Sequence, residues 1–390
     1  MRAAFRHLRV VLAIADGGSV TRAAQTCGVS QPAVTQALQK VEAAAGGALF
    51  DRTRHGLFAT PRGTVLIRRV RRALGRIDPA LRDIAPRLML TATKTQMTAL
   101  IAVIEAQNFT IAARRLGLAQ PTVHRAIALL EAEAGLSLFD RAPHGIVATR
   151  STLALGLAAR LALTELDQAA ADLAEMDGTT AGRIVIGALP LSRSALLPRA
   201  LAMFRSQRPA QQVTVIDGVY SELLGKLRRG EVDIIIGAMR DPVPIADVTQ
   251  EPWYEDSMSV VAGPGHPLIG KGPVAVTDLG GYPWVVAREG TPARDQFQNK
   301  IARHLGQVPL IETGSVLLMR GLLQDNLHLG CVSSGQASPE IAANLMALIE
   351  TGIVWPGRPI GATMRADWLP TAAQIELLEI CRSTAVEYTG

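Results

Sequence analysis

The chain has 390 residues, of which 48% are hydrophobic, 19% are charged and 4% are aromatic. This length is enough for two or three domains, and the balance suits packed globular domains and excludes wholesale disorder. Three scattered cysteines exclude a disulfide framework and show no metal-ligand spacing. No apolar run approaches the roughly 18 residues of a membrane-spanning helix. The basic and apolar start of the chain lacks a convincing cleavage site, so a cytoplasmic protein is expected.

Basic residues outnumber acidic ones, and their excess lies in the first quarter of the chain. Residues 1–90 contain 15 Lys and Arg against 5 Asp and Glu, whereas residues 91–180 contain 7 against 9. Residues 181–390 contain 18 against 20. A basic surface on one segment is expected where a protein neutralises phosphates. The near-neutral remainder excludes a polyanion-binding coat over the whole molecule.

The first 150 residues contain an internal repeat. Residues 19–60 align without a gap to residues 108–149, at a constant offset of 89. Roughly twenty positions are identical, including Gln-Pro, Phe-Asp-Arg and His-Gly in register, which is far above chance for unrelated helices. The same structural unit therefore occurs twice, and we expect domains at 1–90, 91–178 and 183–390.

Each copy predicts three short helices and a hairpin. In copy one, apolar residues at helical spacing predict a first helix from Phe5, and a second helix spans Val20 to Thr26. Gly28 and its counterpart Gly117 permit a sharp turn before the third helix, which opens at Ser30 with a plausible cap. The stripe that faces the core leaves an outer face of small, amide and basic side chains: Gln31, Ala33, Thr35, Gln36 and Lys40.

Small and amide side chains near the start of such a helix can reach base edges in the major groove of DNA. The segment LFDRTRHGLFAT then predicts two short strands around His55-Gly56, a wing that carries Arg52 and Arg54. Helix–helix–turn–helix–wing is the arrangement of a DNA-binding module. A solvated hairpin without function is disfavoured, because shape and charge agree.

These residues resemble the winged helix-turn-helix of LysR-type transcriptional regulators. The matching positions are Ala23-Ala24, Ser30-Gln31-Pro32-Ala33, Thr35, Leu38, Glu42, Gly46 and Leu49-Phe50-Asp51-Arg52. The resemblance implies that Gln31, Pro32, Thr35 and Gln36 face an operator, with Arg52 near phosphate. The complete candidate set for DNA binding is Ser30, Gln31, Pro32, Thr35, Gln36, Lys40, Arg52, Arg54, Gln120, Pro121, Thr122, His124 and Arg125.

The duplication departs from the family, whose usual architecture has one such module. Copy two keeps Gln120-Pro121 and Phe139-Asp140-Arg141 but has Ala119 and His124 where the family has Ser and Ser or Thr. Either both modules bind DNA, or copy two keeps the fold while copy one makes most of the phosphate contacts. The second alternative is favoured here, because affinity follows the number of phosphates neutralised and the segment of copy two is acidic.

A linker helix follows each wing. The first runs from Pro61 to about Ile77, where Asp78-Pro79 ends or kinks it; the second runs from Leu153 to about Glu175. On the first helix one side is apolar, and Arg68, Arg69, Arg72 and Arg76 occupy the other. In the resembled family such helices pair two subunits antiparallel. We therefore expect the two linkers to pair within one chain, with exchange onto another subunit as the alternative.

The segment MDGTTAG at 176–182 is a linker, and strands alternate with helices beyond it. The expected strands are 183–188, 213–217, 232–237, 258–262, 283–287, 310–312 and 329–332, and the expected helices are 194–207, 221–229, 292–305 and one from 316. This alternation suits two α/β lobes joined by crossing strands. GRIVIGALPLSRSALLPRAL, ELLGKLRRGEVDIIIGAMR and VVAGPGHPL resemble the type 2 periplasmic-binding-protein-like effector domain of LysR-type regulators, nearest to the galactose-binding-protein-regulator subgroup.

Ligands of such folds bind between the lobes, at the carboxyl ends of strands and the amino ends of helices. That rule selects the candidate effector-binding residues Ser192, Arg193, Ser194, Gly218, Tyr220, Arg240, Thr291, Ser315 and Ser334. Helix-start amides, hydroxyls and arginines suit a small carboxylate or a sugar-like molecule. For a single serine a helix cap is the commoner role, and for Arg193 and Arg240 a surface salt bridge is an even alternative.

The predicted fold is multidomain, with two winged helix-turn-helix modules and linker helices followed by an α/β two-lobed periplasmic-binding-protein-like domain. The predicted function is sequence-specific transcription regulation, with double-stranded DNA and a small-molecule effector as partners. We expect a homo-oligomer, a dimer or tetramer, with no membrane partner, cofactor, metal or enzymatic activity. A solute-binding protein or an α/β enzyme would explain residues 183–390 but leave the basic repeat without a role.

Overall fold

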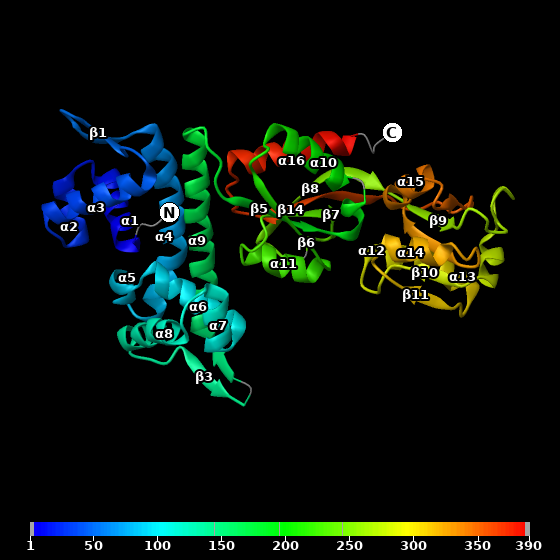
Figure 1. Cartoon of the computed structure of the whole chain (residues 1–390), viewed down its shortest axis with the longest axis horizontal. Coiled ribbons are helices and arrows are strands. Elements are labelled where there is room, and N and C mark those ends of the chain that lie inside the picture. The colour runs from blue at the N-terminus through cyan, green and yellow to red at the C-terminus, as the bar shows by residue number, and fades with distance from the viewer. Residues whose placement is uncertain (1–3, 144, 195, 244, 387–390) are drawn as a thin grey trace. The chain divides into compact units, whose positions relative to one another are not determined.

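The computed structural model describes residues 4–143, 145–194, 196–243 and 245–386. It divides into two compact units, residues 1–182 and residues 183–390, each with its own buried core (Figure 1). The first unit is helical with two small hairpins, and the second is an α/β unit with two sheets. This architecture confirms the predicted fold class. The expected border between the two copies falls inside the first unit, in α5 (Leu88–Thr91).

Copy one folds as the predicted helix–helix–turn–helix–wing, here called module one. Its elements are α1 (Phe5–Gly17), α2 (Val20–Cys27), α3 (Gln31–Ala45), β1 (Phe50–Thr53) and β2 (Gly56–Ala59). Ser19 and Ser30 start the second and third helices, since their hydroxyl oxygens accept backbone N–H groups three residues ahead. Gly28 ends α2 with a φ of 63°, the left-handed conformation that allows the sharp turn.

Copy two repeats this arrangement and is here called module two. Its elements are α6 (Lys94–Ala106), α7 (Phe109–Leu116), α8 (Gln120–Ala134), β3 (Phe139–Ala142) and β4 (Gly145–Ala148). Thr93 and Gln96 form a capping box at the start of α6, and the Asn108 side chain caps α7. The cap of α3 is not reproduced in α8, because Ala119 has no side-chain oxygen to accept a hydrogen bond.

The two linker helices, α4 (Pro61–Ile84) and α9 (Arg150–Met176), lie side by side (Figure 1). They are antiparallel, because ion pairs join Arg62 near the start of α4 to Asp177 beyond the end of α9, and Arg76 to Glu165. Their facing apolar residues are fully or almost fully buried: Leu66, Ile67, Val70, Ala73, Leu74 and Ile77 on α4, and Leu155, Ala159, Ala162, Leu166, Ala169 and Leu173 on α9. The predicted pairing of the linkers within one chain is observed.

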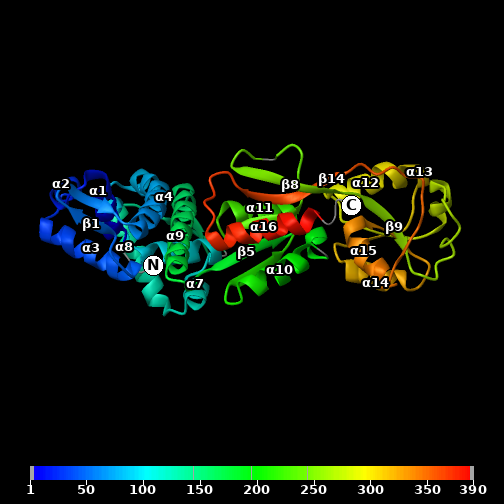
Figure 2. The same ribbon diagram turned by 90° about the horizontal axis from the view of Figure 1, so that it is seen from above.

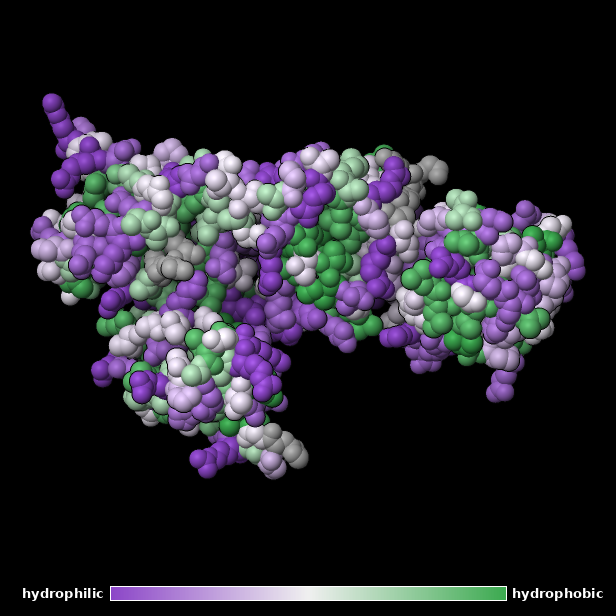
Figure 3. Space-filling model, viewed as in Figure 1, coloured by the Kyte–Doolittle hydropathy of each residue, from purple (hydrophilic) through white to green (hydrophobic). Residues whose placement is uncertain are grey.

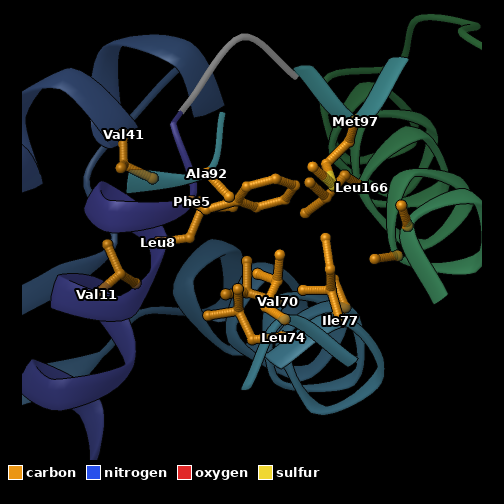
Figure 4. Close-up of a cluster of buried hydrophobic side chains, with 14 of the residues drawn as sticks. Phe5, Leu8, Val11, Val41, Val70, Leu74, Ile77, Ala92, Met97 and Leu166 are labelled. Atoms are coloured by element: carbon orange, nitrogen blue, oxygen red, sulfur yellow. The ribbon is translucent and has the colours of Figure 1, made fainter. Parts of the chain in front are cut away.

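The linker helices and both modules share one hydrophobic core. Figure 4 shows part of it, where Phe5 of α1 and Val70 of α4 lie close to Met97 of α6 and Leu166 of α9. Burial of this continuous apolar surface stabilises the two modules as a single unit. Each module is therefore held by contacts with the linker helices in addition to its own fold.

The first linker helix, which was expected to end or kink at Asp78-Pro79, does not end there. It continues to Ile84, with Pro79 inside it. A proline within a helix removes one backbone hydrogen bond. Burial beyond this position offsets the loss, since Leu81 is fully buried and Asp78 forms an ion pair with Arg9 of α1.

The first lobe of the second unit is a five-stranded sheet with the order β6-β5-β7-β14-β8. The strands are β5 (Arg183–Ala188), β6 (Gln212–Asp217), β7 (Ile234–Ala238), β8 (Val248–Asp256) and β14 (Arg358–Arg365). On one face α10 (Leu196–Gln207) and α16 (Ala372–Val386) lie side by side (Figure 2). The opposite face is covered by α11 (Tyr220–Arg228), so the central strands β5 and β7 are buried on both sides.

The second lobe has the order β11-β10-β12-β9-β13. Its strands are β9 (Met258–Ala262), β10 (Trp284–Val286), β11 (Leu310–Glu312), β12 (Leu329–Ser333) and β13 (Ala347–Leu348). The helices are α12 (Pro292–Phe297), a π-helical turn at Gln298–Ala302, α13 (Arg303–Leu305), α14 (Val316–Leu323) and α15 (Ser334–Ala342), so the helix expected at 292–305 is made of three segments. The described residues of this unit also include two 3-10 turns, η1 (Pro190–Arg193) and η2 (Val276–Gly281).

The chain crosses between the two lobes twice, once at Ser257 between β8 and β9 and once in residues 349–357 before β14. This confirms the prediction of two lobes joined by crossing strands. The positions of β8 and β14 were not predicted, and neither were α15 and α16. Both crossings bring polar residues to the junction of the lobes.

Candidate nucleic-acid interface and ligand site

The outer face of α3 carries the side chains that were predicted to contact DNA. Ser30, Gln31, Pro32, Thr35, Gln36 and Lys40 are all exposed. The helix turns its other face to the core through Val34, Ala37 and Val41, each 5% exposed or less. The Thr35 hydroxyl donates to the carbonyl oxygen of Gln31 over 3.1 Å, which restricts the orientation of this exposed side chain. Hydrophilic residues cover the exposed side of α2 and α3 and extend along the wing (Figure 3).

The wing of module one is held against the turn between α1 and α2. The backbone N–H of Leu57 donates to the carbonyl oxygen of Gly18 over 2.9 Å. Gly56 has a φ of 131°, and a Cβ there would lie 2.8 Å from that same oxygen, so the close approach requires glycine. Arg52 and Arg54 on this wing are exposed. Both arginines thus lie on the β1–β2 hairpin, which is anchored at the turn between α1 and α2.

Module two presents the corresponding face. Gln120, Pro121, Thr122, His124 and Arg125 are all exposed at the start of α8. The ring of His124 packs on Phe109 of α7, with 5.2 Å between ring centroids. The wing is anchored in the same way as in module one, by a 3.3 Å hydrogen bond from the Ile146 N–H to the Gln107 carbonyl oxygen. The described residues of copy two thus form an exposed recognition helix and the two strands of a wing.

Arg69 was expected on the solvent side of α4, but it is fully buried. Its guanidinium donates to Glu165 (3.2 Å), Gln168 (2.9 Å) and Asp172 (2.8 Å), all on α9. Arg72 also donates to Glu165 over 2.8 Å, and Arg76 lies 3.5 Å from it. A helical wheel assigns arginine to solvent, whereas here the facing helix supplies buried acids that satisfy it.

Because of these ion pairs, much of the basic excess of residues 1–90 is neutralised within the first unit. Arg9, Arg62, Arg69, Arg71, Arg72, Arg76 and Arg87 of the basic segment all pair with acids of the first unit. The recognition segments themselves have four basic residues each: Arg22, Lys40, Arg52 and Arg54 in 19–60, and Arg114, Arg115, Arg125 and Arg141 in 108–149. Their acidic residues number two and three. The difference between the copies therefore lies mostly in the linker helices, outside the recognition elements.

In the second unit, the structure brings together Tyr220 and Arg240 of the predicted ligand set. The Arg240 guanidinium carbon lies 4.4 Å from the centre of the Tyr220 ring, a cation–π contact. Burial lowers the pKa of Arg240, and the positive charge of Arg358 lowers it further, while Tyr220 and Asp295 act in the opposite direction. Burial also raises the pKa of Tyr220. Arg240 is half-buried and Arg358 is buried, and their two positive charges act on one another. This part of the lobe therefore favours a bound anion.

Other predicted ligand residues have structural roles. The buried Ser192 hydroxyl donates to the Leu189 carbonyl oxygen over 2.9 Å, and Arg193 pairs with Asp217 over 3.0 Å. Thr291 and Ser315 cap α12 and α14. Ser194 and Gly218 are half-buried at the ends of η1 and β6.

Ser334 lies at the first crossing, where its hydroxyl group is 2.9 Å from the Ser257 hydroxyl and 2.8 Å from the Ser259 hydroxyl. Sequence reasoning missed the polar group next to it. Asp256 at the end of β8 forms a buried ion pair with Arg358 at the start of β14 and accepts the Gly335 N–H over 3.0 Å. The two residues are 102 positions apart in polar stretches, so no spacing in the sequence connects them.

Two buried polar atoms at this junction have no hydrogen-bond partner among the described residues, the Nε of Arg358 and the Oγ of Ser333. Buried donors are normally satisfied, so such atoms indicate a missing partner. They lie at the ends of β14 and β12, which belong to different lobes. The junction therefore holds buried polar groups from both lobes.

Two further observations concern the described ranges as a whole. Within them no helix combines the length and apolarity needed to cross a membrane. The same ranges contain no cluster of three or more His, Cys, Asp or Glu side chains placed to hold a metal ion.

Two exposed recognition helices with wings, together with a two-lobed α/β unit, define a DNA-binding regulator with a ligand-binding domain. Residues 5–64 and 95–152 match the bacterial regulatory helix-turn-helix proteins of the lysR family, and residues 177–385 match the LysR substrate binding domain. The chain therefore belongs to the LysR family of transcriptional regulators.

The chain is similar to the HTH-type transcriptional regulator GalR of Pseudomonas putida, with 32% identity over 388 residues, 98% of this chain and 97% of that protein. It is 28% identical to the HTH-type transcriptional regulator PcaQ of Agrobacterium fabrum over 71% of this chain and 89% of that one. A full-length OxyR variant of Pseudomonas aeruginosa has the same fold with a TM-score of 0.55 and 21% identity, over 75% of this chain and 94% of that chain. The part of this chain that the comparisons with PcaQ and with OxyR do not cover is about the size of one module.

Proposed function

We propose that this regulator binds operator DNA through both winged modules, residues 1–90 and 91–178, and that a small molecule held in residues 183–390 modulates this binding. The observation that carries the proposal is the pair of exposed recognition faces on α3 and α8 with anchored wings. Equal numbers of basic residues on the two recognition segments support a contribution from each module. Ligand binding would shift a population between states that differ in DNA affinity.

The ligand we propose is a small carboxylate or a sugar-like anion. Arg240, stacked on Tyr220, and the unpartnered Nε of Arg358 offer donors to a carboxylate, and the hydroxyl groups of Ser333 and Ser334 offer further hydrogen bonds. An uncharged apolar ligand would leave these donors unsatisfied at a cost in free energy.

We further propose a non-enzymatic protein that works in the bacterial cytoplasm, where its DNA target lies, as a homo-oligomer. No cofactor enters this mechanism. The motifs expected for enzymatic phosphate binding or nucleophilic catalysis are missing from the printed sequence.

DNA binding is tested by fluorescence anisotropy of a mixed-sequence duplex of about 30 base pairs titrated with the full chain at about 50 and 200 mM salt. We expect affinity to fall steeply with salt, by about 10³-fold or more if six phosphates are contacted. Arg52→Ala and Arg125→Ala should each weaken binding. The matched control is Arg228→Ala, which removes an exposed ion pair on α11 of the second unit. Affinity that does not depend on salt would contradict the proposal, as would losses equal to that of the control.

Ligand binding is tested by a thermal-shift screen of small carboxylates and sugar acids with the full chain. A compound that raises the melting temperature of the wild type should have little effect on Arg240→Ala. Arg229→Ala, which removes an exposed pair with Glu231 on the same lobe, is the control. A compound that stabilises Arg240→Ala as much as the wild type would place the ligand elsewhere.

A further inference from the structure

The two recognition helices align without a gap in the sequence repeat but present different side chains. Both begin with an exposed Gln-Pro pair, and their buried positions are alike. The exposed positions that follow differ at five places, which are Ala33 against Thr122, Thr35 against His124, Gln36 against Arg125, Gln39 against Ala128, and Lys40 against Leu129. Helices with similar buried faces and different exposed faces indicate that the two modules recognise different DNA sequences.

The chemistry of these side chains indicates which bases they favour. A glutamine amide pairs in bidentate fashion with adenine, whereas an arginine guanidinium pairs with the O6 and N7 acceptors of guanine. Gln36 and Arg125 occupy equivalent positions in α3 and α8. The two modules also differ at the preceding position. The His124 ring packs on Phe109, whereas the Thr35 hydroxyl is hydrogen-bonded to the Gln31 carbonyl oxygen.

The linker helices favour a pair made of one module of each kind. Arg69, Arg72 and Arg76 of α4 converge on Glu165 of α9. The repeat offset of 89 makes Glu165 the equivalent of Arg76. The contact between Arg76 and Glu165 would therefore become arginine against arginine in a pair of two α4 helices, and glutamate against glutamate in a pair of two α9 helices.

A pair of two α4 helices or of two α9 helices would place like charges together at half-buried or buried positions, which disfavours both pairings. The side chain of Glu165 is 6% exposed and that of Arg69 is fully buried, so solvent screens these charges little. The same complementarity acts whether the partner helix belongs to the same chain or to a second copy. Each pair of modules thus contains one α3 and one α8.

We propose that the operator of this regulator consists of two different half-sites in inverted orientation, one read by module one and the other by module two. The adenine preference of Gln36 belongs to the first half-site and the guanine preference of Arg125 to the second. The inverted orientation follows from the antiparallel pairing of α4 and α9. The proposal rests on DNA binding by both modules as described above.

The test is a selection of binding sites from a pool of random duplexes by the full-length chain, followed by sequencing. We expect a composite motif of two unlike half-sites. The key variant is the triple substitution Ala33→Thr, Thr35→His and Gln36→Arg, which gives module one the recognition residues of module two. It should select an inverted repeat of the second half-site alone.

Single substitutions assign the half-sites. Arg125→Gln should change one position of the second half-site from guanine to adenine, with a loss of about 5- to 150-fold on the wild-type site. Gln36→Arg should make the reverse change in the first half-site only. All of these positions are exposed, and an unchanged thermal melting curve will show that each variant is folded.

The outcomes separate this inference from the proposed function. A symmetric motif selected by the wild type would overturn the inference, because both modules would then read the same sequence. A single half-site that is unaffected by Arg125→Gln would overturn it too, since only module one would read bases. If no motif is enriched at all, the proposed sequence-specific DNA binding itself is wrong.

Discussion

Replacement of Arg69 by methionine tests whether the buried ion pairs between α4 and α9 hold the two modules together. Methionine approximately preserves the volume of the side chain but removes its charge and its donors. The wild-type guanidinium makes three side-chain hydrogen bonds of 2.8 to 3.2 Å to Glu165, Gln168 and Asp172 while being fully buried. The substitution therefore leaves acceptors on α9 without this partner.

The expected loss of stability depends on the contacts that Glu165 and Asp172 keep after the substitution. Removal of one partner of a buried ion pair costs about 3 to 5 kcal/mol, because the other charge stays buried. Glu165 keeps Arg72 at 2.8 Å, and the Asp172 side chain is 13% exposed, so we expect the lower end, about 3 kcal/mol. For a unit of this size that free energy lowers the melting temperature by about 6 to 12 °C.

Arg71→Met is the matched control on the same helix. Its ion pair with Asp16 has side chains that are 58% and 63% exposed. Exposed pairs contribute about 0 to 1 kcal/mol, so the control should melt within about 2 to 3 °C of the wild type.

Differential scanning calorimetry of the full chain gives the melting temperature of the first unit. The four tryptophans, at positions 253, 284, 355 and 368, all lie in the second unit, so tryptophan fluorescence reports that unit separately. Arg69→Met should lower the calorimetric transition and leave the fluorescence transition unchanged. Equal melting temperatures for Arg69→Met and Arg71→Met would refute a buried network, and so would a difference that disappears at a salt concentration of about 1 M.

Three further predictions follow from the same structure. Arg52→Ala and Arg141→Ala should each reduce the slope of log affinity against log salt by about one, since equivalent wing residues would contact one phosphate each; an unchanged slope for one of them would exclude its module from phosphate contact. Gln36→Ala should reduce discrimination at one base position, measured on single-base variants of a selected site, and leave the salt slope unaltered. Burial raises the pKa of Cys331 and of Cys381 to about 12, so both thiols should be inert to Ellman's reagent at about pH 8 until the chain is unfolded, and labelling of either in the native protein would contradict their burial.

The sequence predicted the two modules well because two independent signals agree there. Helical spacing of apolar residues locates α1 to α3, and the repeat at offset 89 transfers the same assignment to α6 to α8. Turn chemistry is local too: the wing of each module depends on a glycine with positive φ, at Gly56 and Gly145, and both are visible in the sequence. Such features depend on neighbours in the chain and need no knowledge of tertiary contacts.

The features that the sequence did not predict all depend on distant partners. The α4 helix continues through Pro79 because Leu81 is buried beyond it, and β8 and β14 are strands because they pair with each other. The polar residues at the junction of the lobes come from strand ends that only the sheet topology brings together. Asp256 and Arg358 are an example, since either residue alone resembles an ordinary surface charge.

Arg69 shows that dependence on distant partners also affects how the charge of the sequence is interpreted in terms of function. An arginine-rich helix next to a DNA-binding module suggests a surface for phosphate, and by that count module one would dominate DNA binding. In the structure, acids of α9 pair with Arg69, Arg72 and Arg76 of this helix, and the fully buried Arg69 cannot reach a phosphate. The recognition helices and wings of the two copies have four basic residues each, so they do not account for the basic excess of the first segment. Part of the basic excess of the first segment thus joins one module to the other, because Arg62, Arg69, Arg72, Arg76 and Arg87 pair with acids of the second copy.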